Sequence, residues 1–144
     1  MGFRVISSPI EAEYEDIVIS SQTVTANSLL EQVSGATSWT VCTLTSTHFT
    51  PKAIASAAAS SSATSVHARL VTGFELVEAE VTETASSDDD GDLMVLTDLD
   101  TVNNTGTTSS TEYATFRQKK VGSTTSTIVG KILVGNGVNP DATT

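Results

Sequence analysis

Short segments in which apolar and polar residues alternate run through this sequence. Between Glu75 and Thr82, for example, acidic residues separate Val77, Ala79 and Val81. Successive side chains of a β-strand point to opposite faces, so this period of two places the apolar residues on one face and the charges on the other. We therefore expect a half-buried strand here with a negative outer face, and a fold built from such strands.

Serine and threonine supply 43 of the 144 residues, as 19 serines and 24 threonines. Threonine suits the half-exposed face of a strand and serine suits turns, whereas helical domains are richer in Leu, Glu, Lys and Ala. A disordered chain is the alternative that such a composition raises. Hydrophobic residues reach 38%, however, and they recur in the short alternating groups that disordered chains generally lack.

Turn-forming residues divide the chain into short strands. Gly91, Gly106 and Gly122 mark three of the turns. We expect strands within residues 17–19, 37–44, 67–71, 75–82, 93–96, 113–121 and 126–134. With further short segments this makes eight or nine strands. The length suits one domain, so the sequence predicts a mainly β fold: a small single-domain β-barrel or β-sandwich with one or more short helical turns.

Two segments leave alternatives open. Ser28-Leu29-Leu30-Glu31 matches a capping box and precedes Gly35, which fits either a single helical turn or an irregular loop with two buried leucines. Residues 51–66 combine alanines, which favour helix, with serines, which favour a turn. We expect a strand of small residues, a turn and a second strand there, because residues 67–71 continue as a strand. A short helix is the alternative.

The two ends of the chain differ from its middle. Pro9 interrupts the sequence near the start, so we expect residues 1–10 to form an N-terminal arm, either as a strand or as a free segment. Residues 11–135 form the expected β-rich domain and residues 136–144 a C-terminal tail. The start lacks the apolar segment of a secretory signal, which predicts synthesis in the cytoplasm, and no run of 18 apolar residues indicates a membrane partner.

Charge is abundant and unevenly distributed. The net charge is -10, with 17 acidic and 7 basic residues, which argues against nucleic acid or anionic lipid as a partner. Residues 75–100 contain ten acids and no base, whereas Arg117, Lys119, Lys120 and Lys131 all lie later. This polarity suits docking onto a complementary surface or strand pairing inside the fold. A solvated surface that keeps the protein in solution is the simpler interpretation.

The residue types that carry catalysis do not form a recognisable set. Cys42 lies among threonines in an expected strand, with nothing nearby in sequence to lower its pKa, so we interpret it as a small packed side chain rather than a nucleophile. His48 and His67 follow no paired metal-ligand spacing and are interpreted as surface or core residues. We therefore predict no catalytic residues and no enzymatic activity.

The acidic run at residues 88–92 is the one candidate for a cation site. Asp88, Asp90 and Asp92 alternate as in a calcium loop, but Leu93 and Leu99 occupy positions where an EF-hand needs Gly and Glu. A turn or mobile loop that attracts cations only weakly is the preferred interpretation. Gly135-Asn136-Gly137 precedes no helix that would hold a phosphate. The sequence thus predicts neither a metal site nor a cofactor.

Several segments between residues 18 and 135 resemble the head decoration, or capsid cement, proteins of tailed bacteriophages. The segments that carry the resemblance are Gly91-Asp92-Leu93-Met94-Val95-Leu96-Thr97-Asp98, Thr101-Val102-Asn103-Asn104-Thr105-Gly106, Ile128-Val129-Gly130-Lys131-Ile132-Leu133, Thr23-Val24-Thr25-Ala26-Asn27-Ser28-Leu29-Leu30 and the alanine-rich residues 52–59. They are turn and strand patterns without a catalytic fingerprint.

The resemblance implies a structural virion protein. Such a protein is added to the outer surface of an icosahedral capsid, commonly as a homotrimer, where it stabilises contacts between major capsid subunits. Its partners would be the major capsid protein and its own copies. The alternative is a structural component of a phage tail tube or fibre.

The N-terminal arm supplies the candidate binding residues. We expect Phe3, Arg4, Val5 and Ile6 to add as a strand to a neighbouring sheet and so to contact the capsid. On this hypothesis, deletion of residues 1–9 weakens particle binding without unfolding the domain.

Overall fold

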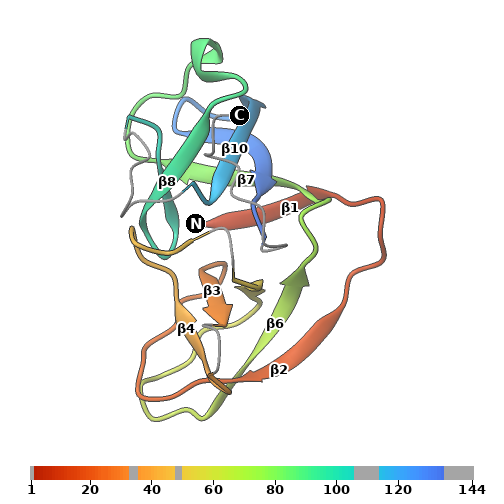
Figure 1. Ribbon diagram of the computed structural model, residues 1–144, viewed down its shortest axis with the longest axis vertical. Helices are drawn as coiled ribbons and strands as arrows, with labels where there is room; N and C mark the ends of the chain where they lie inside the picture. The colour runs from red at the N-terminus through yellow and green to blue at the C-terminus, as the bar shows by residue number, and fades with distance from the viewer. Residues whose placement is uncertain (1, 33–35, 48–49, 106–113, 135–144) are drawn as a thin grey trace.

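The computed structural model describes residues 2–32, 36–47, 50–105 and 114–134 of the chain (Figure 1). Within these residues the protein is almost entirely β-structure, with one short 3-10 turn, η1, at Ser87–Asp89. The strands, in chain order, are β1 Phe3–Ser7, β2 Tyr14–Val18, β3 Leu29–Gln32, β4 Trp39–Val41, β5 Lys52–Ala55, β6 Ser65–Val71, β7 Leu76–Val81, β8 Leu93–Asp98, β9 Thr101–Asn103, β10 Phe116–Val121 and β11 Thr127–Ile132. The mainly β, single-domain prediction is therefore confirmed.

A closed five-stranded barrel forms the part of the molecule drawn uppermost in Figure 1. Strands β7, β11, β10, β8 and β9 follow one another around it, and a parallel pairing of β9 with β7 completes the circle. The remaining pairs are antiparallel. Strand β1 adds to β7 outside this circle, so β7 pairs with three different strands along its length.

The second sheet has the order β2-β6-β5-β3-β4 and lies below the barrel in Figure 1. All its strand pairs are antiparallel. A single parallel bridge between Ile19 and Trp39 joins the two edges of this sheet. Both sheets therefore curve back on themselves, and each encloses apolar side chains.

One strand links the two cores. Leu29 and Leu30 are neighbours on β3 and both are fully buried, but they face opposite ways. Leu29 packs into the barrel core with Phe116, whereas Leu30 packs with Trp39 and Ala53 inside the second sheet. Because β3 is covered on both faces, the barrel and the second sheet share a continuous interior.

The expected helical turn at Ser28–Glu31 is wrong, since residues 29–32 form β3. Ser28 Oγ donates to the Thr25 carbonyl at 2.6 Å instead of accepting from Glu31 as a capping residue would. A strand is recognised in a sequence by alternating apolar and polar residues. Here two adjacent leucines are both buried, one on each face of the strand, so that alternation is absent and the sequence does not indicate a strand. The irregular-loop alternative is wrong for the same residues.

The alanine-rich segment begins as a strand, as expected. Residues 52–55 form β5, and β6 follows at 65–71, so the short-helix alternative is wrong. Ala53, Ala55 and Ala68 are fully buried in the second core. Small side chains let neighbouring strands and layers approach closely here.

The number of strands was underestimated. The described residues contain eleven strands rather than eight or nine, because β3 and the three-residue β9 had no alternating pattern to mark them. The N-terminal arm is the strand β1 of its own chain, not a free segment. The expected C-terminal tail, residues 136–144, lies outside the described residues.

Candidate functional surfaces

The four predicted binding residues of β1 divide into two pairs. Phe3 is fully buried in the barrel core, with its ring centroid 6.4 Å from that of Phe116, and Val5 packs partly against the same core. Arg4 is exposed, and Ile6 is 41% exposed. The side chains of Phe3 and Val5 thus serve the core of their own chain, and capsid contact by Phe3, Arg4, Val5 and Ile6 stays a prediction.

Arg4 is held by a buried carboxylate. Its guanidinium forms an ion pair with Glu78 of β7. The same carboxylate accepts from Ser123 N at 2.6 Å, from Ser123 Oγ at 2.7 Å and from Thr127 Oγ1 at 3.2 Å. Hydrogen bonds from Ser123, followed by the contacts with Arg4 and Thr127, lower the pKa of Glu78 to about 2 despite its burial.

A hollow of about 300 Å³ lies between β1 and the β10–β11 turn, and we call it the β1 cleft. Its lining residues are Arg4, Ile6, Glu78, Lys120, Val121, Gly122, Ser123 and Val129. Ile6 and Val121 are 41% and 40% exposed, so two large apolar side chains border it. Lys120 gives its rim a positive charge, and Arg4 is paired there with Glu78. An apolar patch with a polar rim is typical of protein-docking surfaces.

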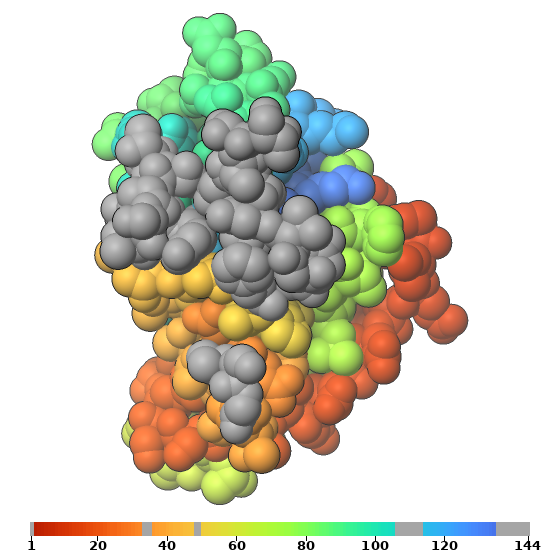
Figure 2. Space-filling model, in the orientation of Figure 1, coloured from red at the N-terminus to blue at the C-terminus, as the bar shows by residue number. Residues whose placement is uncertain are grey.

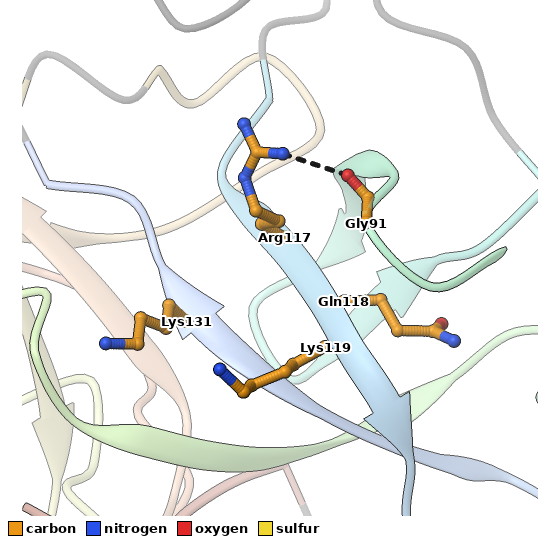
Figure 3. A pocket seen from close by; sticks show the side chains of 5 residues that line it. All are labelled: Gly91, Arg117, Gln118, Lys119 and Lys131. Atoms are coloured by element: carbon orange, nitrogen blue, oxygen red, sulfur yellow. Dashed lines mark hydrogen bonds between the residues drawn. The ribbon is translucent and has the colours of Figure 1, made fainter. Parts of the chain in front are cut away.

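A second hollow, of about 290 Å³, lies further along β10 and β11 (Figure 3). We call it the basic cleft, because Arg117, Lys119 and Lys131 line it together with Gly91 and Gln118. In Figure 3 the Lys119 and Lys131 side chains extend to the same side, while the Gln118 side chain points away across β10. Gln118 instead donates to the Ser86 carbonyl at 2.7 Å.

The cations of the basic cleft lie close together by strand register. Arg117 and Lys131 are directly paired across β10 and β11. Like charges at paired positions of neighbouring strands repel each other and destabilise the pair. The Arg117 guanidinium donates to the Gly91 carbonyl at 2.9 Å, which orients it without neutralising its charge. A concave surface with three cations is thus present on a chain of net charge -10.

Cys42 belongs to a buried polar cluster at the junction of the two sheets. Glu31 accepts from Ser46 Oγ and, at 2.8 Å, from Thr50 Oγ1. The buried Lys52 donates to the Thr50 carbonyl at 2.9 Å and to Thr50 Oγ1 at 2.6 Å. Sequence patterns missed this cluster because Ser46 and Thr50 come from the turn that follows β4, and no spacing rule links them to Glu31.

Burial sets the chemistry of this cluster. Burial, and after it the negative charge of Glu31, raise the pKa of the Cys42 thiol to about 12. Burial also lowers the pKa of Lys52. A thiol with so high a pKa is protonated at neutral pH and is a poor nucleophile. Its position in the core agrees with the interpretation of Cys42 as a packed side chain.

His67, the histidine that the structure describes, does not lie beside Cys42. His67 lies on the outer face of β6, with Nδ1 2.8 Å from Asp16 Oδ1 and its ring stacked on Tyr14 at 5.5 Å. Cys42 instead lies in the barrel core. His48 lies outside the described residues.

The acidic run forms the turn η1 and the residues after it. Ser86 Oγ accepts from Asp88 N at 3.1 Å, and Asp90 Oδ1 accepts from Gln118 Nε2 at 2.8 Å. No group of three or more metal-ligating side chains occurs among the residues that the structure describes. In those same residues no helix is long and apolar enough to cross a membrane.

Comparisons with known proteins gave no match to this chain among family models, curated proteins or solved structures.

Proposed function

We propose that this protein is a non-enzymatic structural component of a bacteriophage virion, which binds the outer surface of the icosahedral capsid and stabilises contacts between major capsid subunits. The β1 cleft is the observation that carries the proposal. It places the exposed apolar residues Ile6 and Val121 beside Lys120 and the ion pair of Arg4 with Glu78 on the barrel. Such a surface supports docking onto a large protein assembly, and the sequence resemblance supplies the identity of that assembly.

The bonding of the buried ionisable groups supports a structural rather than a catalytic role. Glu31, Lys52, Glu75 and Glu78 are all buried, and each is hydrogen-bonded to side-chain or backbone groups of its own chain. Glu75, for instance, accepts from Thr72 N at 2.9 Å and from Gly73 N at 2.9 Å, which fixes the turn before β7. Groups committed to internal bonds stabilise the fold and are not poised for proton transfer to a substrate.

Capsid binding is tested by adding the purified protein to undecorated capsids and measuring the bound copies after co-sedimentation. We expect saturation at a copy number set by the icosahedral symmetry. Ile6→Asp and Val121→Asp each place a charge at the apolar centre of the β1 cleft and should weaken binding at least about tenfold. Leu44→Asp makes the same kind of change at an exposed apolar residue in the turn after β4 and should leave binding unchanged.

Two results would overturn the proposal. The first is absence of binding by the wild-type protein. The second is electron-microscopic density for this chain on the tail of native particles instead of the head, which would favour the tail-tube or fibre alternative.

A further inference from the structure

The positive charges of the basic cleft are not neutralised by described groups of the same chain. Arg117 and Lys131 donate to the carbonyl oxygens of Gly91 and Phe74, at 2.9 and 3.4 Å, and neither forms an ion pair within the described residues. The Lys119 side chain forms no hydrogen bond or ion pair within the described part of the chain. Since Arg117 and Lys131 repel each other across the strand pair, an incoming carboxylate would stabilise all three side chains.

The same chain carries an acidic segment with matching chemistry. Glu11, Glu13 and Glu15 alternate along the approach to β2, and all three are exposed. The Glu13 carbonyl accepts from Leu70 N at 2.9 Å, which continues the β2–β6 pairing to this residue. In an extended chain, residues two apart project on the same side at a spacing of about 6.6 Å. Arg117 and Lys119 are likewise two residues apart on β10, both are exposed, and both line the basic cleft.

These two surfaces lie on different parts of the molecule. The connection from β1 to β2 runs along the outer margin of the molecule, beside the second sheet, in Figures 1 and 2. The basic cleft lies on β10 and β11 of the barrel. Within the described residues no ion pair joins the acidic segment to the basic cleft of the same chain, so both surfaces remain available to a second copy.

We propose that the basic cleft of one copy binds the acidic segment Glu11–Glu15 of a second copy. The contact joins two different surfaces, so it is head-to-tail and each copy keeps one free donor and one free acceptor surface for further copies. Each chain has a net charge of -10, so two copies repel each other at long range. At physiological ionic strength, however, charges interact mainly within about 8 Å. The attraction between the paired charges at the contact therefore outweighs the repulsion between the two net charges. The contact uses residues outside the β1 cleft and goes beyond the proposed capsid binding.

Sedimentation velocity of the full chain measures this association. We expect the wild-type protein to self-associate at about 50 mM NaCl and to dissociate at about 500 mM NaCl, because salt screens the pairs. Lys119→Glu and Glu13→Lys should each weaken self-association at least about tenfold. Glu83→Lys, which makes the same charge change as Glu13→Lys on an exposed residue outside the acidic segment, the basic cleft and the β1 cleft, should not.

Exchanging the charges of Lys119 and Glu13 distinguishes a direct contact between these two residues from a general effect of the net charge. A mixture of the Lys119→Glu and Glu13→Lys proteins should associate again, and so should the chain that carries both substitutions. Circular dichroism of each variant checks that it remains folded.

A wild-type protein that is monomeric at low salt would overturn the proposal, as would a Lys119→Glu variant that associates normally. If Lys119→Glu instead abolishes binding of a single-stranded DNA oligonucleotide while self-association persists, the cleft binds nucleic acid and the proposal is wrong. Capsid binding by the Lys119→Glu protein is measured separately, so failure of this contact is distinguishable from failure of the proposed function.

Discussion

Glu78 shows how a single buried carboxylate ties several strands together. It belongs to β7 and bonds to Arg4 of β1, to Ser123 in the β10–β11 turn and to Thr127 of β11. Sequence alternation assigned Glu78 to a solvent-facing side of its strand, and this expectation is wrong. The error has a physical cause: β7 is covered on both faces at this point, and the polar groups that satisfy the carboxylate lie 45 and 49 residues away in sequence.

Replacement of Glu78 should have a pH-dependent effect on stability. The pKa of this carboxyl falls from its ordinary value of 4.5 to about 2 on folding, so its stabilising contribution is complete above about pH 5 and is lost as the pH falls toward 2. Glu78→Gln should therefore lower the free energy of unfolding at neutral pH by roughly 1 to 3 kcal/mol. Denaturant titrations should show this difference shrinking between pH 5 and pH 2. The exposed Glu83→Gln provides the control, and a difference that persists unchanged in acid would contradict the assignment.

The Cys42 thiol should resist modification in the folded protein. It is buried, and its pKa of about 12 leaves little thiolate at pH 8. We expect a disulfide reagent to label it at least about a hundredfold more slowly in buffer than in denaturant, because reaction requires opening of the core. Absorbance of the released thiol chromophore follows the rate. Fast labelling without denaturant would show that the thiol is accessible.

At the scale of the elements, some strands can be predicted from the sequence and others cannot. Strands with one covered face, such as residues 116–121 and 65–71, are predicted from the sequence by alternation and turn residues. The strand β3 is not, because both of its faces are buried and its two leucines serve different cores. For the candidate surfaces, the sequence supplied Arg4 and Ile6 and the cluster of late basic residues. It could not supply the clefts themselves, since these depend on which strands become neighbours.

Strand β1 is expected to be essential for stability. Phe3→Ala removes a fully buried aromatic side chain from the barrel core and should lower the free energy of unfolding by about 3 to 5 kcal/mol. Ile6→Ser, at an exposed position of the same strand, should change it by less than about 1 kcal/mol. Deletion of residues 1–9 should therefore destabilise the protein, contrary to the free-arm hypothesis. Thermal unfolding measured by circular dichroism tests all three proteins, and a deletion variant with an unchanged midpoint would restore that hypothesis.

Gly130 of β11 allows close approach of β10. A Cβ atom there would overlap the Arg117 carbonyl oxygen and lie 2.7 Å from the Phe116 ring. Gly130→Ala should lower the free energy of unfolding by about 3 kcal/mol through overpacking. At Gly91 a Cβ would meet nothing within 4 Å. Gly91→Ala should therefore lower the free energy of unfolding only by the strain of the positive φ at this residue, about 1 kcal/mol. Equal losses in the two variants, measured by urea titration, would exclude overpacking at Gly130.

On the scale of the whole molecule, the shared interior makes the two sheets one folding unit. Leu29 and Ile54 of the second sheet, together with Cys42 just after β4, pack into the barrel core. The protein has a single tryptophan, Trp39, which lies in the other core. Fluorescence of Trp39 and circular dichroism of all the strands therefore report on different parts of one structure.

Unfolding should be a single transition. We expect the denaturant midpoints from Trp39 fluorescence and from circular dichroism to coincide, because neither sheet can bury Leu29 and Leu30 without the other. Leu29→Ala should shift both midpoints together and lower the free energy of unfolding by about 2 to 5 kcal/mol. Two separated midpoints, or a shift in only one of them, would show that the barrel and the second sheet unfold independently.

The three pairings of β7 have a consequence for synthesis on the ribosome. Strand β7 is complete at residue 81, but its partners arrive at different times: β1 precedes it, β9 follows about twenty residues later, and β11 ends only at residue 132. A nascent chain in which β11 is still inside the exit tunnel has one side of β7 without its partner. During that interval the growing polypeptide offers a site where chaperones or neighbouring nascent chains can pair, and the emergence of β11 from the tunnel is what removes it.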